Sequence, residues 1–241
     1  DRSEELAVLS LQGPKATELL ASLLSHPLPR NLPYNHSESV LGGVKARICR
    51  VDRTRAGGYD LIVERQNLPL GWHLMLENGK NKGVHPVGFE SFNVHRIEAG
   101  IPWYGLDIEE NTLPIEAGLE KDAISFNKGC YIGQESVARI TYRGHVNRKL
   151  AGLSLSGDQP VSKGDKIFKE GEEVGGVTSS AYSPNLKIAI ALGYLRREVL
   201  EPGTAVFIES SDGGVDAEVT PLPFPQQSTS LRGTANDGLS H

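Results

Sequence analysis

Cys130 is the residue of this chain whose setting most favours covalent chemistry. It stands in the segment KGCYIGQESVAR, between Gly129 and Gly133. Glycine reaches backbone angles that other residues adopt only at a cost, so the chain can turn sharply here or press against a ligand. This pattern indicates a reactive thiol. The alternative, a small buried cysteine that only fills space, stays open on the residues alone.

The residues around the thiol supply charge and a helix start. The stretch from Gln134 is compatible with a helix, and a thiol just before a helix faces unpaired N–H groups and the positive end of the dipole. Lys128 and Arg139 add positive charge, which favours the thiolate. Gln134 and Glu135 are candidates to orient a ligand or the thiol, although Glu135 is equally an ordinary first-turn acid.

A second candidate site is the segment RIEAGIPWYG, residues 96–105. Arg96 and Glu98 fall at the end of a predicted helix, and the glycines and proline that follow force an irregular loop that displays Trp103 and Tyr104. Arginine can hold a carboxylate with two hydrogen bonds, and an aromatic face can stack on a flat ring. The alternative is a helix-end ion pair beside an aromatic corner of the core.

The elements that must position these residues form an alternating pattern of strands and helices, which favours an α+β class. Strands are predicted at residues 6–12, 44–51 and 59–64, the last two antiparallel through a turn at 52–58. Helices are predicted from Pro14 through residue 24, around 68–78 and around 89–99, the last stopped by Gly100. Cys49, within the second strand, is expected to be structural.

From about residue 147 the pattern changes to short apolar segments separated by turn residues, which predicts a small sandwich or barrel. The segments are LAGLSL, KIFKEG, EVGGVTSSA, IAIALGYL and TAVFIE. The final residues are polar and expected to be disordered. We therefore expect an α+β domain over residues 1–146, a β domain over 147–225 and a tail over 226–241.

Composition narrows the classes of function. Apolar residues make up 38% and charged residues 23%, as in ordinary globular proteins, and the net charge of −5 argues against a general nucleic-acid binder. No apolar run is long enough to cross a bilayer, which predicts a soluble protein. The two cysteines, Cys49 and Cys130, form no CxxC pair, so we expect a reducing compartment, no disulfide and no protein-only zinc site.

The segment KGCYIGQESVAR resembles the signature KGC-aromatic-x-GQE-x-x-x-R of the YgfZ family. These are folate-binding proteins that assist iron–sulfur cluster assembly or repair and are related to the glycine-cleavage T-protein. The matching residues are Lys128, Gly129, Cys130, Tyr131, Gly133, Gln134, Glu135 and Arg139. LSLQGPKATELL, GGYDLIV, RIEAGIPWYGLDI, LPIEAGL and GGVTSSAYSPNLKIAIALGYL agree in order, so the resemblance extends over residues 6–222.

The resemblance implies a folate-binding α+β domain followed by a small C-terminal antiparallel β-barrel. It implies tetrahydrofolate as cofactor, no stably bound metal, and iron–sulfur assembly or client proteins as partners, in a cytoplasm or an organellar matrix or stroma. Arg96 and Phe92 become folate-site candidates by position, together with Glu98, Trp103 and Tyr104. Asp60 lies where the T-protein carries an acidic folate contact, but a neighbouring acid of that pattern is missing, and a solvent-facing Asp60 is favoured.

Three functions follow from the resemblance. The first is a folate-dependent accessory factor in iron–sulfur cluster assembly or maintenance, with Cys130 as its reactive residue. The second is a tetrahydrofolate-dependent aminomethyl or methyl transferase, and the third is a non-enzymatic scaffold of the same fold. A further N-terminal segment normally precedes LQGPKA in this family, so the chain is expected to be an incomplete member, which weakens the case for the transferase.

Overall fold

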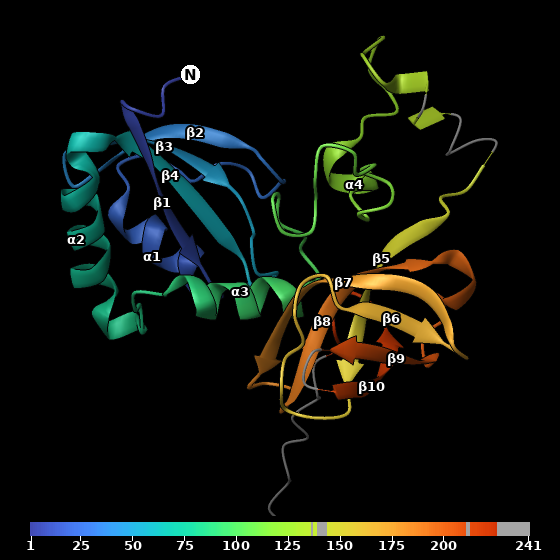
Figure 1. Cartoon of the computed structure of the whole chain (residues 1–241). Helices are drawn as coiled ribbons and strands as arrows, with labels where there is room; N and C mark the ends of the chain where they lie inside the picture. The colour runs from blue at the N-terminus through green and yellow to red at the C-terminus, as the bar shows by residue number, and fades with distance from the viewer. Residues whose placement is uncertain (136, 139–143, 211–212, 226–241) are drawn as a thin grey trace, which may run out of the picture.

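The computed structural model describes residues 1–135, 137–138, 144–210 and 213–225. A four-stranded antiparallel sheet with two helices lies at one end of the molecule, and a closed β-barrel lies at the other (Figure 1). Helix α3 (Phe89–Glu98) runs between them. The predicted fold class, a mixed α/β domain followed by a small antiparallel β-barrel, is confirmed.

The sheet has the strand order β1-β4-β3-β2. Its strands are β1 (Leu6–Gln12), β2 (His36–Leu41), β3 (Val44–Arg50) and β4 (Gly58–Glu64). Alternate residues such as Leu9, Leu61 and Ile48 are buried, as period-two strands require. They pack with residues of α1 (Ala16–Leu23) and α2 (Leu68–Gly79), so the sheet and these two helices share one core.

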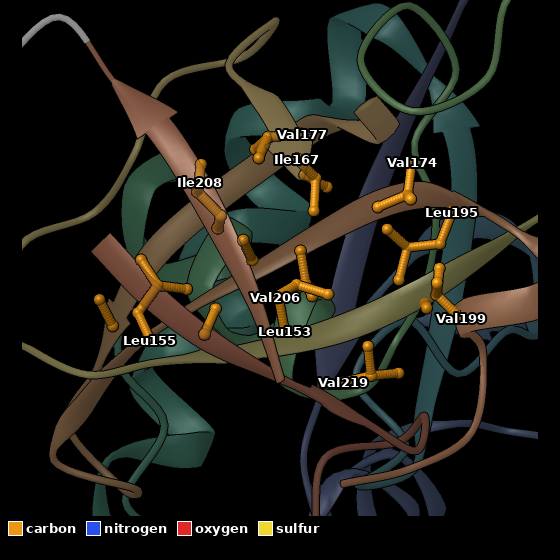
Figure 2. Close-up of a cluster of buried hydrophobic side chains, with 14 residues drawn as sticks. Leu153, Leu155, Ile167, Val174, Val177, Leu195, Val199, Val206, Ile208 and Val219 are labelled. Atoms are coloured by element: carbon orange, nitrogen blue, oxygen red, sulfur yellow. The ribbon is translucent and has the colours of Figure 1, made fainter. Parts of the chain in front are cut away.

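The barrel closes in the order β10-β5-β8-β7-β6-β9. Its strands are β5 (Arg148–Leu155), β6 (Lys166–Lys169), β7 (Glu172–Ser183), β8 (Ile188–Arg196), β9 (Ala205–Ser210) and β10 (Gly213–Thr220). Figure 2 shows the interior, where Leu153, Ile167 and Ile208 are among the aliphatic side chains that fill it. Because strand closure leaves no free edge, this small unit needs no further strand partner.

Two strands were not predicted from the sequence. β2 is an edge strand of the sheet and pairs with β3, and it carries His36, Ser37 and Glu38, which give no apolar alternation. β10 begins with two glycines, although Val215, Ala217 and Val219 do alternate along it. Both strands owe their conformation to pairing with a partner strand, which a local pattern does not reveal.

A third apolar cluster joins α3 to the outside of the barrel. Ile97 of α3 packs with Leu150, Ile190, Leu192 and Phe224. The chain then passes through a loop and the single turn α4 (Glu120–Ala123) before it enters β5. The described residues also form short 3-10 turns, η1 (Arg65–Asn67), η2 (Lys80–Lys82) and η3 (Arg197–Val199). Among the helices described, none has the length and apolar character to span a bilayer.

Candidate functional site

A cavity of about 1570 Å³ lies where the sheet, α3 and the barrel meet. Its walls come from β1, the turn after β3, α2, α3, the turn between β7 and β8, and residues 223–225. We call it the sheet–barrel cavity. Small-molecule sites usually measure about 300–1,000 Å³, so this space accommodates a ligand with two ring systems and a charged tail.

The end of α3 turns the chain back toward this cavity. The amide of Gly100 donates to the carbonyl of Ile97 at 2.8 Å, and the amide of Ile101 donates to that of Arg96 at 2.8 Å, which is the Schellman pattern. Gly100 has φ +66, and a Cβ there would lie 2.7 Å from Leu222. Only glycine satisfies both conditions, so the predicted stop at Gly100 is confirmed.

Arg96 is fully buried and holds this turn against the barrel. The ion pair between Arg96 and Asp107 is 1% and 0% exposed at its two side chains. The Nε atom of Arg96 donates to Asn93 at 2.8 Å and Nη2 donates to Ser179 at 2.6 Å, so every nitrogen of the guanidinium has a protein partner. Arg96 lies outside the lining of the sheet–barrel cavity. The geometry gives it a positioning role.

Asp107 completes the same network. It accepts hydrogen bonds from the Trp103 amide at 2.9 Å and from the Ser179 hydroxyl at 2.7 Å. The amides of Leu106, Asp107 and Ile108 in turn donate to the Trp103 carbonyl. Both backbone groups of Trp103 are therefore fixed, and Asp107, which holds the amide, is tied to β7 through Ser179.

Three aromatic rings form one wall of the sheet–barrel cavity. Trp103 contacts Phe92 edge to face with ring centroids 5.3 Å apart, and it contacts Phe89 in the same way at 5.8 Å. Trp72 of α2 also lines the cavity. Such a cluster offers apolar faces to a flat heterocycle. Tyr104, the next residue after Trp103, lies outside the lining and is 65% exposed.

Glu98 lies at the cavity edge and connects α3 to the barrel. Its carboxylate accepts hydrogen bonds from Ser183 at the end of β7, at 2.6 Å, and from Asn185 in the turn that follows, at 2.9 Å. Its backbone carbonyl accepts from the amide of Phe224 at 2.9 Å. Glu98 thus holds two barrel segments that line the cavity.

Asp60 is buried, which corrects the expectation that it faces solvent. It is 6% exposed and forms an ion pair with Arg53, which lies in the turn after β3 and lines the cavity. The Arg53 amide donates to Gln12 at 2.9 Å, which fixes that turn against β1. The side chain of Asp60 is on the face of the sheet away from the helices, but the guanidinium of Arg53 covers it.

The rim of the cavity is basic. Lys15, Arg53, Arg55 and Lys82 line it, and Glu98 is the one acid among the lining residues. Arg53 is compensated by Asp60 and Lys82 by Glu18. Arg55 donates to the carbonyl of Ala99 at 2.7 Å, so it also braces the end of α3. This charge pattern favours a ligand with an anionic tail.

The cysteine motif lies apart from this cavity. Cys130 is exposed and is absent from the cavity lining. Figure 1 shows the chain after α4 projecting away from both the sheet and the barrel. Residues 134, 135, 137 and 138 are helical, as expected, and Arg139 lies outside the described residues.

Local contacts give the motif a defined shape. The ammonium of Lys128 lies 4.7 Å from the ring centroid of Tyr131, and the Tyr131 amide donates to the Gln134 side chain at 3.1 Å. Gly133 has φ +89, and a Cβ at Gly129 or Gly133 would meet no atom within 4 Å. The space around Cys130 is therefore open to a partner molecule.

Cys49 differs from Cys130 in environment. It lies on β3 opposite Asp60 and is half-buried. Burial, followed by the negative charge of Asp60, raises the pKa of the Cys49 thiol. Less of this thiol is ionised at neutral pH, so its reactivity toward electrophiles is lowered.

We expect iodoacetamide at neutral pH to modify Cys130 well before Cys49, because Cys130 is exposed and the Cys49 thiolate is disfavoured. The rate at Cys49 should keep rising with pH beyond the midpoint of a free thiol such as N-acetylcysteine. Mass spectrometry of Cys49→Ser and Cys130→Ser variants separates the two rates. Equal rates at both sites would contradict this assignment.

The structure brings Phe92, Glu98 and Trp103 together around one cavity and places Arg96 and Asp60 behind it. Tyr104 and the cysteine motif are elsewhere. Sequence reasoning missed Arg53, Trp72 and Phe89. Arg53 had a weak signal as a basic residue in a strand-connecting turn, whereas the other two had none beyond their apolar character. Within the described ranges, no group of three or more histidine, cysteine or acidic side chains could hold a metal ion.

Comparison with known proteins agrees with this architecture. The GCVT N-terminal domain matches residues 1–128, and the glycine cleavage T-protein C-terminal barrel domain matches residues 148–225. An aminomethyltransferase of Halothermothrix orenii is 33% identical over 93% of this chain and 62% of its own length. One from Thermotoga maritima is 34% identical over 82% of this chain and 53% of its own length.

A solved structure has the same fold. The crystal structure of glycine cleavage system aminomethyltransferase T from Bartonella henselae aligns with a TM-score of 0.76 at 27% identity, over 92% of this chain and 60% of that protein. The chain thus spans between 53% and 62% of the length of these three relatives. Because the first family domain alone matches more than half of its residues, the chain belongs to the glycine cleavage T-protein family.

Proposed function

We propose that this chain binds tetrahydrofolate in the sheet–barrel cavity and takes part in folate-dependent transfer of an aminomethyl-type one-carbon unit. The observation that carries the proposal is the junction of the aromatic wall with the basic rim in one cavity. The relatives' name, aminomethyltransferase, supports the same class of reaction. When bound, tetrahydrofolate supplies the nitrogen atoms that accept and release the one-carbon unit.

The residues present fit such a ligand. Phe92 and Trp103 offer apolar faces for the pterin or benzoyl ring, and Glu98 supplies a carboxylate for ring N–H groups. Lys15 and Arg55 supply positive charge for the glutamate carboxylates. Binding and orientation of the folate are the tasks that these side chains perform.

Tetrahydrofolate should raise the thermal unfolding midpoint of the 241-residue chain, because a ligand that binds only the folded state stabilises it by mass action. At one hundred times Kd the stabilisation is about 2.7 kcal/mol, which for a chain of this size raises the midpoint by about 5–11 °C. p-Aminobenzoylglutamate, which lacks the pterin ring, is the matched ligand and should give a smaller shift. If the thermal unfolding midpoint with tetrahydrofolate equalled the midpoint in buffer with the same reductant alone, the proposal would be contradicted.

A second candidate function rests on Cys130. The exposed thiol stands in a complete YgfZ-type signature on a projecting segment, with open space at both flanking glycines. These features support an accessory role in iron–sulfur cluster assembly or maintenance. Since clusters are commonly held by four protein ligands, one thiol would act as a transient ligand shared with a client or assembly protein.

Cys130→Ser should abolish complementation of an iron–sulfur maintenance defect by the native protein, because a hydroxyl does not replace the thiolate as nucleophile or iron ligand. Tetrahydrofolate affinity should not change, since Cys130 does not line the cavity. Cys49→Ser is the control and should complement normally. Full complementation by Cys130→Ser would exclude the thiol role.

A further inference from the structure

A second pocket, of about 530 Å³, lies on the outer face of the barrel. It is bounded by β5, β7 and β8 on one side and by the turn over residues 106–112 on the other. None of its lining residues lines the sheet–barrel cavity. The two spaces are therefore separate candidates for ligands.

A buried hydroxyl marks this pocket. Tyr194 lines it and is 8% exposed, and its hydroxyl makes no hydrogen bond within the described residues. Thr112 lies beside it but outside hydrogen-bond geometry, and the Thr112 hydroxyl already accepts from the Glu109 amide at 3.0 Å. Buried polar groups almost always have partners, so an unpartnered hydroxyl on a residue that lines a pocket points to a ligand.

The hydroxyl is a hydrogen-bond donor at neutral pH. Burial, followed by the negative charge of Asp107, raises the pKa of Tyr194 to about 12. The phenol therefore stays protonated and suits a ligand atom that accepts a hydrogen bond.

Positive charge stands next to this donor. Arg196 follows Tyr194 by two residues on β8, so both side chains lie on one face of the strand. Arg148 of β5 is directly opposite Arg196, and its guanidinium carbon lies 4.9 Å from the centroid of the Tyr194 ring. Like charges placed opposite each other on a sheet are unfavourable, and a negative charge near them reduces that cost.

One of these charges has no counter-ion. Each of the other three basic side chains that line the pocket has an acidic partner, in the pairs Arg148–Glu116 at 3.1 Å, Lys163–Glu109 at 3.7 Å and Lys166–Glu173 at 2.7 Å. Asp107, which also lines the pocket, pairs with Arg96. Arg196 has no ion pair in the part of the chain that the structure describes. The pocket thus carries one uncompensated positive charge.

Space for a ligand exists beside the two groups. Gly176 of β7 faces Tyr194 across the β7–β8 pair, and a Cβ at Gly176 would come no closer than 3.8 Å to another atom. A side chain here would occupy the pocket, and glycine leaves it open.

We propose that this pocket binds a small oxyanion, a carboxylate or a phosphate, through the Tyr194 hydroxyl and the Arg196 guanidinium. Both groups donate hydrogen bonds, and an oxyanion has enough oxygen atoms to accept from both of them. This site is additional to the folate cavity and does not depend on it.

The test is calorimetric titration of the 241-residue chain with inorganic phosphate and, separately, with glutarate, both in buffer of matched chloride concentration. We expect saturable binding of at least one of them at a single site. Phosphate alone would identify a phosphate ligand, and glutarate alone a carboxylate ligand. Absence of binding by both would overturn the proposal.

Variants locate the site. Tyr194→Phe should weaken binding about tenfold, which is the size of one lost hydrogen bond to a charged group, and Arg196→Gln should weaken it at least as much. Arg197→Gln, an exposed neighbour outside the pocket, is the matched control and should bind normally.

Without ligand, Tyr194→Phe should unfold no more readily than the wild type, because it removes only an unpartnered hydroxyl. Unchanged affinity in Tyr194→Phe and Arg196→Gln, or equal loss in Arg197→Gln, would overturn the assignment. Tetrahydrofolate binding reports on the other cavity, so failure of one proposal is distinguishable from failure of the other.

Discussion

Replacement of Arg96 with alanine should lower the free energy of unfolding by about 3–5 kcal/mol, the usual cost of removing one partner from a buried ion pair. The substitution leaves Asp107 buried and without its cation, beside the Trp103 amide and the hydroxyl of Ser179. It also leaves an empty volume between α3 and β7. Urea denaturation of the purified variant measures the loss.

The matched control for Arg96 is Arg47, whose ion pair with Glu38 is exposed at both side chains. Arg47→Ala should change the unfolding free energy by no more than about 1 kcal/mol, as for other surface pairs. The double variant Arg96→Ala with Asp107→Ala should regain part of the loss, because no unpaired charge remains buried. An Arg96→Ala variant as stable as Arg47→Ala would contradict the structural role given to this arginine.

Replacement of Trp103 with alanine should weaken tetrahydrofolate binding about five- to 150-fold, because stacking of a flat heterocycle on an aromatic side chain contributes about 1–3 kcal/mol. Trp103 is the centre of the aromatic wall, in contact with Phe89 and Phe92. Affinity is measured by calorimetry at a temperature where circular dichroism shows the variant to be folded.

The adjacent residue offers a close control. Tyr104 is a neighbouring aromatic that is exposed and does not line the cavity, so Tyr104→Ala should bind tetrahydrofolate as the wild type does. If Tyr104→Ala lost as much affinity as Trp103→Ala, the ligand would lie on the outer side of this loop and the site assignment would be wrong.

Much of the fold was predictable because its signals are local. Alternating apolar residues predicted β3, and helical spacing of apolar residues predicted α1. Short apolar runs and the turns between them predicted β1, β4 and the helices α2 and α3. Gly100 predicted the end of α3, and the structure supplies the reason in its positive φ and the nearby Leu222. β2 and β10 were missed because their conformation depends on pairing with other strands, β2 with β3 and β10 with β5 and β9.

The site was only partly predictable, since its key contacts join residues far apart in the sequence. Arg96 drew attention as a possible carboxylate ligand, but Asp107 and Ser179, which occupy its guanidinium, lie 11 and 83 residues away. Asp60 forms its ion pair with Arg53, and the sequence of the turn that contains Arg53 gives no strong indication of this contact. Burial of charge is a property of the assembled fold, so neither pair could be assigned from spacing.

The signature around Cys130 and the aromatic cavity lie in different parts of the molecule, so the two proposed functions can be tested separately. A thiol variant tests the first without touching the lining of the second, and an aromatic variant does the reverse. Retention of folate binding in Cys130→Ser together with loss of complementation would mean that the thiol acts in a step other than folate binding.

The most direct test of the central claim is calorimetric titration of the 241-residue chain with tetrahydrofolate under anaerobic conditions. We predict saturable binding with one folate per chain, at a site that Trp103→Ala weakens and Tyr104→Ala does not. Absence of saturable heat from a chain that is folded by circular dichroism would contradict the assignment of the sheet–barrel cavity as a folate site.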